Sequence, residues 1–235
     1  MHTQEAINAH ILALFERWRA ELETRHPHLF SRAFSNVFCP GVTAEWSCSP
    51  MRVLLVGEEA TWESRTRYPD YTDNELQKCQ QWIVGDLEKQ LNGDEERHPS
   101  PFWRRIHALH EAFPQAAFCW ANIDCINADT RRALRETDRK DLHDCEIQLV
   151  REMVDIIRPT HILFCGWHNT SLQHEFPELC ERVYPRKIGD AHFMKTNGYI
   201  LKTDYQGISA VFTYHPSWAA ANSNAYIARL IETLR

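Results

Sequence analysis

Residues 52–59 of the chain read Arg-Val-Leu-Leu-Val-Gly-Glu-Glu, and they give the clearest indication of the fold class. The apolar run 53–56 is typical of a strand that is buried on both faces of a parallel sheet. Gly57 allows the backbone to turn sharply or to approach a ligand closely. Glu58 and Glu59 follow at the carboxyl end of the strand, where open α/β sheets bind their ligands. Two interpretations of these acids stay open: they are functional, or they begin the next helix, where acids suit the helix dipole.

Apolar runs alternate with amphipathic segments along the rest of the chain. The pattern predicts strands over 52–57, 116–123, 161–165 and 208–214, and helices over 4–24, 73–91, 102–113, 144–157 and 222–234. Asp73 is the expected N-cap of the second helix, and Asn197-Gly198 predicts a hairpin. The alternation predicts a three-layer α/β/α sandwich with a central four-stranded parallel sheet. We expect a single domain over 1–235, with a helical N-terminal extension of about 1–50.

The composition favours a folded protein without membrane segments. Apolar residues make up 43% of the chain, enough for a sizeable core. No apolar run approaches the ~20 residues that cross a bilayer, and Glu5 interrupts the N-terminus, so we predict no membrane contact, no signal peptide and a cytoplasmic location. The net charge of −6 is unusual for a nucleic-acid binder. A basic cluster is nevertheless present, either as a solvated face or as a contact to phosphates; its members are Arg131, Arg132, Arg135, Arg139 and Lys140.

The eight cysteines include no Cys-x-x-Cys pair, so their spacing predicts neither a disulfide framework nor a zinc site. We expect them to be reduced thiols. Cys119 and Cys165 lie in apolar, strand-like runs and are predicted to be small core residues.

Polar residues follow each of the four predicted strands. They are Glu58 and Glu59 after the first, Asn122 and Asp124 at the second, Gly166, Trp167 and His168 after the third, and His215 and Ser217 after the fourth. Because parallel strands end at one edge of a sheet, these residues are predicted to line one cleft. Singly, each has a structural explanation: Asn122 could close a turn, and His215 could be a packing residue. An acid, an amide and a histidine together favour a catalytic site.

Three ordered motifs of the chain resemble those of the uracil-DNA glycosylase superfamily. The first family motif follows a strand as Gly-Gln-Asp-Pro-Tyr or Gly-Glu-Ala-Pro-Gly, and residues 57–61 read Gly-Glu-Glu-Ala-Thr. The central motif ends a strand with a base-reading asparagine, as in Thr-Asn-Val-Val-Lys-Cys, and residues 121–125 read Ala-Asn-Ile-Asp-Cys. The last motif is His-Pro-Ser or His-Pro-Ala, and residues 215–217 read His-Pro-Ser. The order and approximate spacing agree over residues 50–235.

The resemblance implies a DNA glycosylase that flips a nucleotide out of the duplex and hydrolyses its N-glycosidic bond, leaving an abasic site. Glu58 or Glu59 would stabilise the cation-like sugar and orient the attacking water. Glu58 matches the acid of one branch of the family and Glu59 the acid of the other. His215 would donate a hydrogen bond to O2 of the leaving base, and Asn122 would bind the pyrimidine edge. No catalytic lysine stands beside the motifs, so we expect hydrolysis without a lyase step, that is, a monofunctional enzyme. We also expect that it needs no metal or other cofactor.

The resemblance also implies residues that bind the base and the DNA. The base-binding residues are Thr61, Trp62 and Tyr68, with Tyr71 as a further stacking candidate. The DNA-binding residues are Gly166, Trp167, His168, Ser217 and Trp218. Trp218 follows the last motif, where family members insert an apolar wedge into the base stack; packing beneath a helix is its alternative role.

Departures from the family bear on the substrate and the cofactor. Thr61 replaces the tyrosine that excludes 5-substituted bases in one branch, and Ala60 replaces the proline. We therefore expect a substrate bulkier than uracil, such as a hypermodified pyrimidine of viral DNA, which implies a role in antiviral defence. The missing Cys-x-x-Cys pair predicts that there is no iron–sulfur cluster. Asp124 replaces a basic residue of the central motif.

Two other functions stay open. One is a module that recognises modified DNA without cleaving it. The other is a hydrolase of free nucleosides or nucleotides, which the net charge of −6 favours. For the glycosylase we expect a monomer whose partner is DNA.

Overall fold

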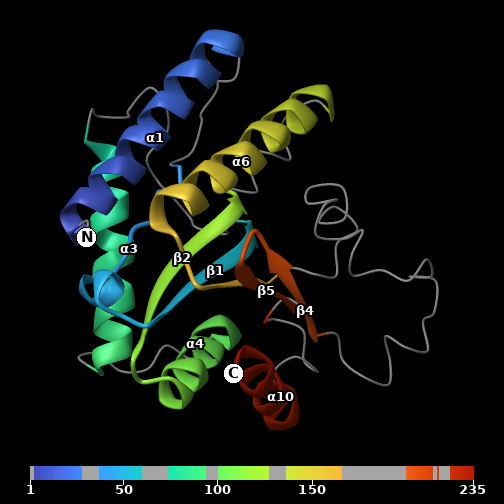
Figure 1. Cartoon of the computed structure of the whole chain (residues 1–235). Coiled ribbons are helices and arrows are strands. Elements are labelled where there is room, and N and C mark those ends of the chain that lie inside the picture. The colour runs from blue at the N-terminus through green and yellow to red at the C-terminus, as the bar shows by residue number, and fades with distance from the viewer. Residues whose placement is uncertain are drawn as a thin grey trace.

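The computed structural model describes residues 3–27, 37–59, 74–93, 100–126, 136–165, 200–213, 216 and 223–235. Within these ranges, a five-stranded sheet lies between two groups of helices (Figure 1). The elements in chain order are α1 (Gln4–Arg25), η1 (Ala44–Ser47), β1 (Met51–Glu59), α3 (Glu75–Asn92), α4 (Pro101–Ala112), β2 (Ala116–Asp124), α6 (Glu136–Ile157), β3 (His161–Cys165), β4 (Ile200–Tyr205), β5 (Ile208–Thr213) and α10 (Asn224–Leu234). The predicted α/β class is confirmed. None of the described helices has the length and apolar character that a bilayer crossing requires.

The sheet has one strand more than predicted. Its order is β2-β1-β3-β5-β4, in which the first four strands are parallel and β4 runs antiparallel to β5. The turn between β4 and β5 is Gln206-Gly207, and both residues have positive φ, 53° and 83°. Two-residue hairpin turns with this backbone match the twist of the strands. The hairpin predicted at Asn197-Gly198 falls outside the described residues.

Alternate residues of the strands face opposite layers of helices. In β1, Leu54 and Val56 pack with residues of α1 and α6, whereas Val53 and Leu55 pack with residues of α4 and α10. Each of these four side chains is at most 1% exposed. Figure 1 shows α1 and α6 on one side of the sheet, with α4 and α10 on the other. Burial on both faces is the reason that the run 53–56 is continuously apolar.

The start of α6 differs most from the prediction, and the other helix boundaries agree with it within two residues. α6 begins at Glu136 and not at 144, because the charged segment before 144 continues the same helix. Acids in its first turn favour the helix dipole, and Leu142 in this added part is fully buried. α3 begins at Glu75, with Asn74 in the N-cap position, and Asp73 lies outside the described residues. High charge therefore concealed the amphipathic first two turns of α6.

The segment 37–43 covers the outer edge of β2. Val42 forms an antiparallel bridge with Cys119, and a second bridge joins the start of the segment to Ile126. Asn8 of α1 holds Val42 in place: its Oδ1 accepts from the Val42 N–H at 2.8 Å, and its Nδ2 donates to the Val42 carbonyl at 3.1 Å. Part of the N-terminal extension expected over about 1–50 thus pairs with the sheet.

The chain changes its direction of travel across the sheet after β2. It passes from β1 to β2 through α3 and α4, and returns past β1 to β3 through α6. α4 and α6 lie on opposite faces, as right-handed crossovers in opposite directions require. β1 and β3 therefore flank the topological switch point, and ligand crevices form there, outside the carboxyl ends of the strands. In this sheet, those ends of β1 and β3 are at Glu59 and Cys165.

Candidate functional site

The carboxyl ends of the four parallel strands form one continuous row. Gly57 of β1 is in register with Asn122 of β2 on one side and with Cys165 of β3 on the other. Cys165 is in turn in register with Thr213 of β5. Each of the three family-like motifs contains or closely follows a member of this row: residues 57–61, residues 121–125, and residues 215–217.

Glu58 and Glu59 are the last residues of β1, so the interpretation in which they begin the next helix is wrong. The next described helix begins only at Glu75. Glu59 is in register with Asp124, the last residue of β2. The backbone of the first motif is therefore extended strand up to its second acid.

Asn122 is held in one orientation by its neighbour in the strand. The side chain is 5% exposed, and the indole Nε1–H of Trp120 donates to its Oδ1 at 3.3 Å. Only the amide oxygen can accept this bond, which fixes the direction of the amide. The amide nitrogen of Asn122 makes no hydrogen bond with any residue that the structure describes. It is thus a donor available to a ligand.

The Trp120 ring is itself fixed by aromatic packing. Its centroid lies 4.8 Å from that of Phe38, 4.6 Å from that of Phe102 and 5.9 Å from that of Trp103. These rings come from the segment before β1 and from the start of α4. Edge-to-face and tilted contacts at such separations add to the stability that burial provides. The Trp120 donor, and through it the Asn122 amide, is rigidly placed.

Gly57 makes room for the Asn122 amide. A Cβ atom at residue 57 would lie 2.2 Å from Asn122 Oδ1, closer than any non-bonded contact allows. The strand continues past Gly57, so the sharp turn predicted there is wrong, and the close approach to a ligand stays a prediction. The group that lies close to Gly57 is a side chain of the neighbouring strand.

A buried arginine lies under the ends of β3 and β5. Arg105 of α4 is 1% exposed, and its Nη1 donates to Thr213 Oγ1 at 2.9 Å and to Cys165 Sγ at 3.6 Å. Its guanidinium carbon lies 5.8 Å from the centroid of the Tyr226 ring. Sequence reasoning missed this residue. Its position three residues after Phe102, within the apolar stripe of α4, was the available signal.

Polar groups also meet where β2 packs against α6. Asp124 Oδ1 lies 2.9 Å from His143 Nδ1. Glu146, which is fully buried, accepts through Oε1 from the Ile126 N–H at 3.1 Å and from the Cys125 thiol at 3.3 Å. Asp124 was a predicted strand-end residue, whereas His143 and Glu146 were missed. Their spacing of three places them on one face of α6.

Most of the other predicted site residues fall outside the described part of the chain. They are Thr61, Trp62, Tyr68, Gly166, Trp167, His168, His215, Ser217 and Trp218. Their contacts therefore stay predictions. Asn122, Asp124 and the strand course of Glu58 and Glu59 are the parts of the predicted site that the structure describes.

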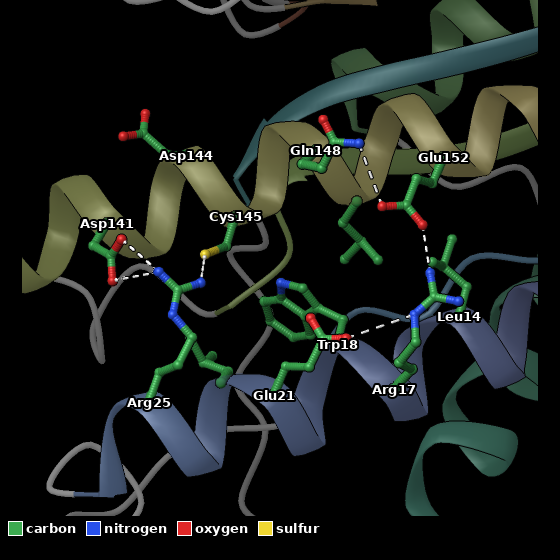
Figure 2. A pocket seen from close by; sticks show the side chains of 12 residues that line it. Leu14, Arg17, Trp18, Glu21, Arg25, Asp141, Asp144, Cys145, Gln148 and Glu152 are labelled. Atoms are coloured by element: carbon green, nitrogen blue, oxygen red, sulfur yellow. Dashed lines mark hydrogen bonds and ion pairs between the residues drawn. The ribbon is translucent and has the colours of Figure 1, made fainter.

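A separate cavity of about 300 Å³ lies between α1 and α6 (Figure 2). Ion pairs close it at both ends: Arg17 pairs with Glu152, and Arg25 pairs with Asp141 at 3.0 Å. Arg25 Nη1 also donates to Cys145 Sγ at 3.1 Å. Burial raises the pKa of the Cys145 thiol, although the arginine opposes this, so the sulfur is a poor nucleophile. We interpret these contacts as a junction between two helices.

Comparison with known proteins adds no identification: the chain matches no protein-family model, and no curated protein has significant sequence similarity to it.

Proposed function

We propose that the chain is a DNA glycosylase that hydrolyses the N-glycosidic bond of a flipped uracil or 5-substituted pyrimidine. The observation that carries the proposal is the row at the carboxyl edge of the sheet. Gly57 begins the acid motif, Asn122 is the amide of the central motif, and Thr213 ends the strand just before His215. An acid, an amide and a histidine separated widely in sequence would then surround one flipped base.

In the proposed reaction, Glu58 or Glu59 orients the attacking water and stabilises the positive charge that develops on the sugar. His215 donates to O2 of the base as the base leaves with negative charge. The buried guanidinium of Arg105, bonded to Thr213 at the end of β5, would add positive potential that favours the same anion. The chain's own side chains thus supply each electrostatic role.

The fixed orientation of Asn122 suggests which pyrimidines are accepted. Because Trp120 occupies one lone pair of Oδ1, the free amide N–H groups are the natural contact for a pyrimidine carbonyl at position 4. A cytosine presents an amino donor there, which would face another donor. We therefore favour 4-keto bases, with a substituent at position 5 accommodated through Thr61.

The test is incubation with two oligonucleotide sets, one containing uracil and one containing hypermodified pyrimidines of the viral type. Abasic sites are scored by alkaline cleavage and the released base by mass spectrometry. We expect Glu58→Gln or Glu59→Gln, and also His215→Ala, to slow release at least about a hundredfold. Glu111→Gln, an exposed acid on α4, is the matched control and should retain full activity.

Three outcomes separate the alternatives. Release of uracil alone would remove the 5-substituted substrate from the proposal. DNA binding without release of any base would favour the non-catalytic module. Cleavage of a free nucleoside but of no oligonucleotide would favour the nucleoside hydrolase, which the net charge of −6 suits.

A further inference from the structure

We propose that Asp124, His143 and Glu146 bind one divalent transition-metal ion of the Zn²⁺ type where β2 meets α6. One ligand atom from each residue lies within 4.8 Å of the other two. One imidazole with two carboxylates is a donor set that suits Zn²⁺ and its first-row neighbours. The inference is independent of the glycosylase proposal, which assigns no metal.

The backbone brings the three donors together from two elements. Asp124 ends β2, whereas His143 and Glu146 lie three residues apart on α6 and so share one helix face. Zinc holds nitrogen and oxygen ligands at about 2.0–2.2 Å, so donors around it are about 3.4 Å apart. The pair Asp124 Oδ1 and His143 Nδ1 is already at 2.9 Å. To reach a separation of about 3.4 Å, this pair would widen slightly and the Glu146 donor, within 4.8 Å of both, would move closer.

The surroundings of the cluster support its ligands in the way that metal sites require. Glu146 is fully buried, and its Oε1 is fixed by the Ile126 N–H and the Cys125 thiol. Such outer contacts orient a ligating carboxylate. The side chains of His143 and Asp124 are 24% and 17% exposed, which gives an ion a path from solvent.

A cation between Asp124 and Glu146 would offset the repulsion between their carboxylates. Two carboxylates close together repel each other, and the repulsion is strongest where one of them is removed from water. A divalent ion between them turns the repulsion into attraction and joins the end of β2 to α6. Protonation of His143 is another source of positive charge beside these carboxylates. It differs from metal binding in a measurable way, because only metal binding makes the stability of the chain depend on metal.

The test uses the full chain, stripped with EDTA and titrated with ZnCl2 by calorimetry, with thermal unfolding measured in parallel. We expect one Zn²⁺ per chain and a rise in Tm on saturation. His143→Ala and Glu146→Gln should weaken binding at least about tenfold. Glu146→Gln keeps an oxygen acceptor for the Ile126 N–H, so it guards against simple misfolding. His10→Ala, which removes an exposed histidine of α1, should bind as the unchanged chain does.

Two results would overturn the proposal. One is the absence of saturable Zn²⁺ binding to the stripped chain, with stability that changes with pH but not with metal. The other is equal affinity of the wild-type chain and His143→Ala, which would assign binding to other surface groups. Neither result bears on base excision, so the metal site and the glycosylase proposal fail separately.

Discussion

Replacement of Gly57 by alanine tests how the central row is built. The new Cβ would lie 2.2 Å from Asn122 Oδ1, so the amide oxygen must move by about 1.3 Å to reach an ordinary non-bonded separation. That shift breaks the hydrogen bond from Trp120, at a cost of about 0.5–1.5 kcal/mol. It also forces the side chain off its preferred rotamer, at a cost of about 0.5–1.5 kcal/mol. We expect Gly57→Ala to lower the free energy of unfolding by about 1–3 kcal/mol.

Gly57→Ala should no longer destabilise the chain when the Asn122 side chain is removed. In an Asn122→Ala background, the nearest remaining contact of the new Cβ is the Ala121 carbonyl oxygen at 3.7 Å, which is an ordinary one. Gly57→Ala should then be neutral, or stabilising by about 0.4–1 kcal/mol through the reduced freedom of the unfolded chain. Activity should be lost in both backgrounds, because Asn122 is displaced in one and absent in the other.

The assay is urea unfolding followed by far-UV circular dichroism on the four chains of the double-mutant cycle, with unchanged m-values as the check on two-state behaviour. We expect a coupling free energy of about 2 kcal/mol between the two positions. Additivity within about 0.5 kcal/mol would mean that residue 57 and the Asn122 amide do not compete for the same space, which contradicts this prediction.

Three further predictions concern charge and thiols elsewhere. A double-mutant cycle on Arg25→Ala and Asp141→Asn should give a coupling of about 0.2–1 kcal/mol that shrinks at high salt, because this ion pair is partly exposed. Burial raises the pKa of Cys79 to about 11, so mass spectrometry should show its alkylation in the folded chain lagging far behind that of the exposed Cys48; equal rates would contradict this. Burial lowers the pKa of His161, so its contribution to stability is present above pH 6.5 and is lost as the pH falls through the folded value. His161→Gln should therefore reduce the change in unfolding free energy with pH between about pH 7.5 and 5.5, as measured by urea unfolding.

The parts of the fold that sequence predicts well are those with one dominant signal. The run 53–56 is apolar without alternation, and burial on both faces is the simplest cause. β4 was missed because an edge strand needs only one buried face, and Lys202 and Asp204 break its apolar pattern. The start of α6 was missed because charge outweighed the helical period in its first two turns.

The site was predictable only where a polar residue ends a strand. Asn122 and the two acids have that signal. Arg105 lies inside a helix, and its importance depends on where α4 crosses the ends of β3 and β5, which no local pattern encodes. His143 and Glu146 depend in the same way on the packing of α6 against Asp124. Tertiary placement, not residue type, makes these groups part of a site.

The pairing of segment 37–43 with β2 affects how the chain could be shortened. An outer strand carries unpaired N–H and C=O groups that act as a template for another chain. At the other edge, β4 is short, and Lys202 ties it to α10 through a 2.7 Å bond to the Thr233 carbonyl. A chain that began at about residue 50 would lose the bridges at Cys119 and Ile126 and leave this edge of the sheet uncovered. It should therefore self-associate more readily than the full chain.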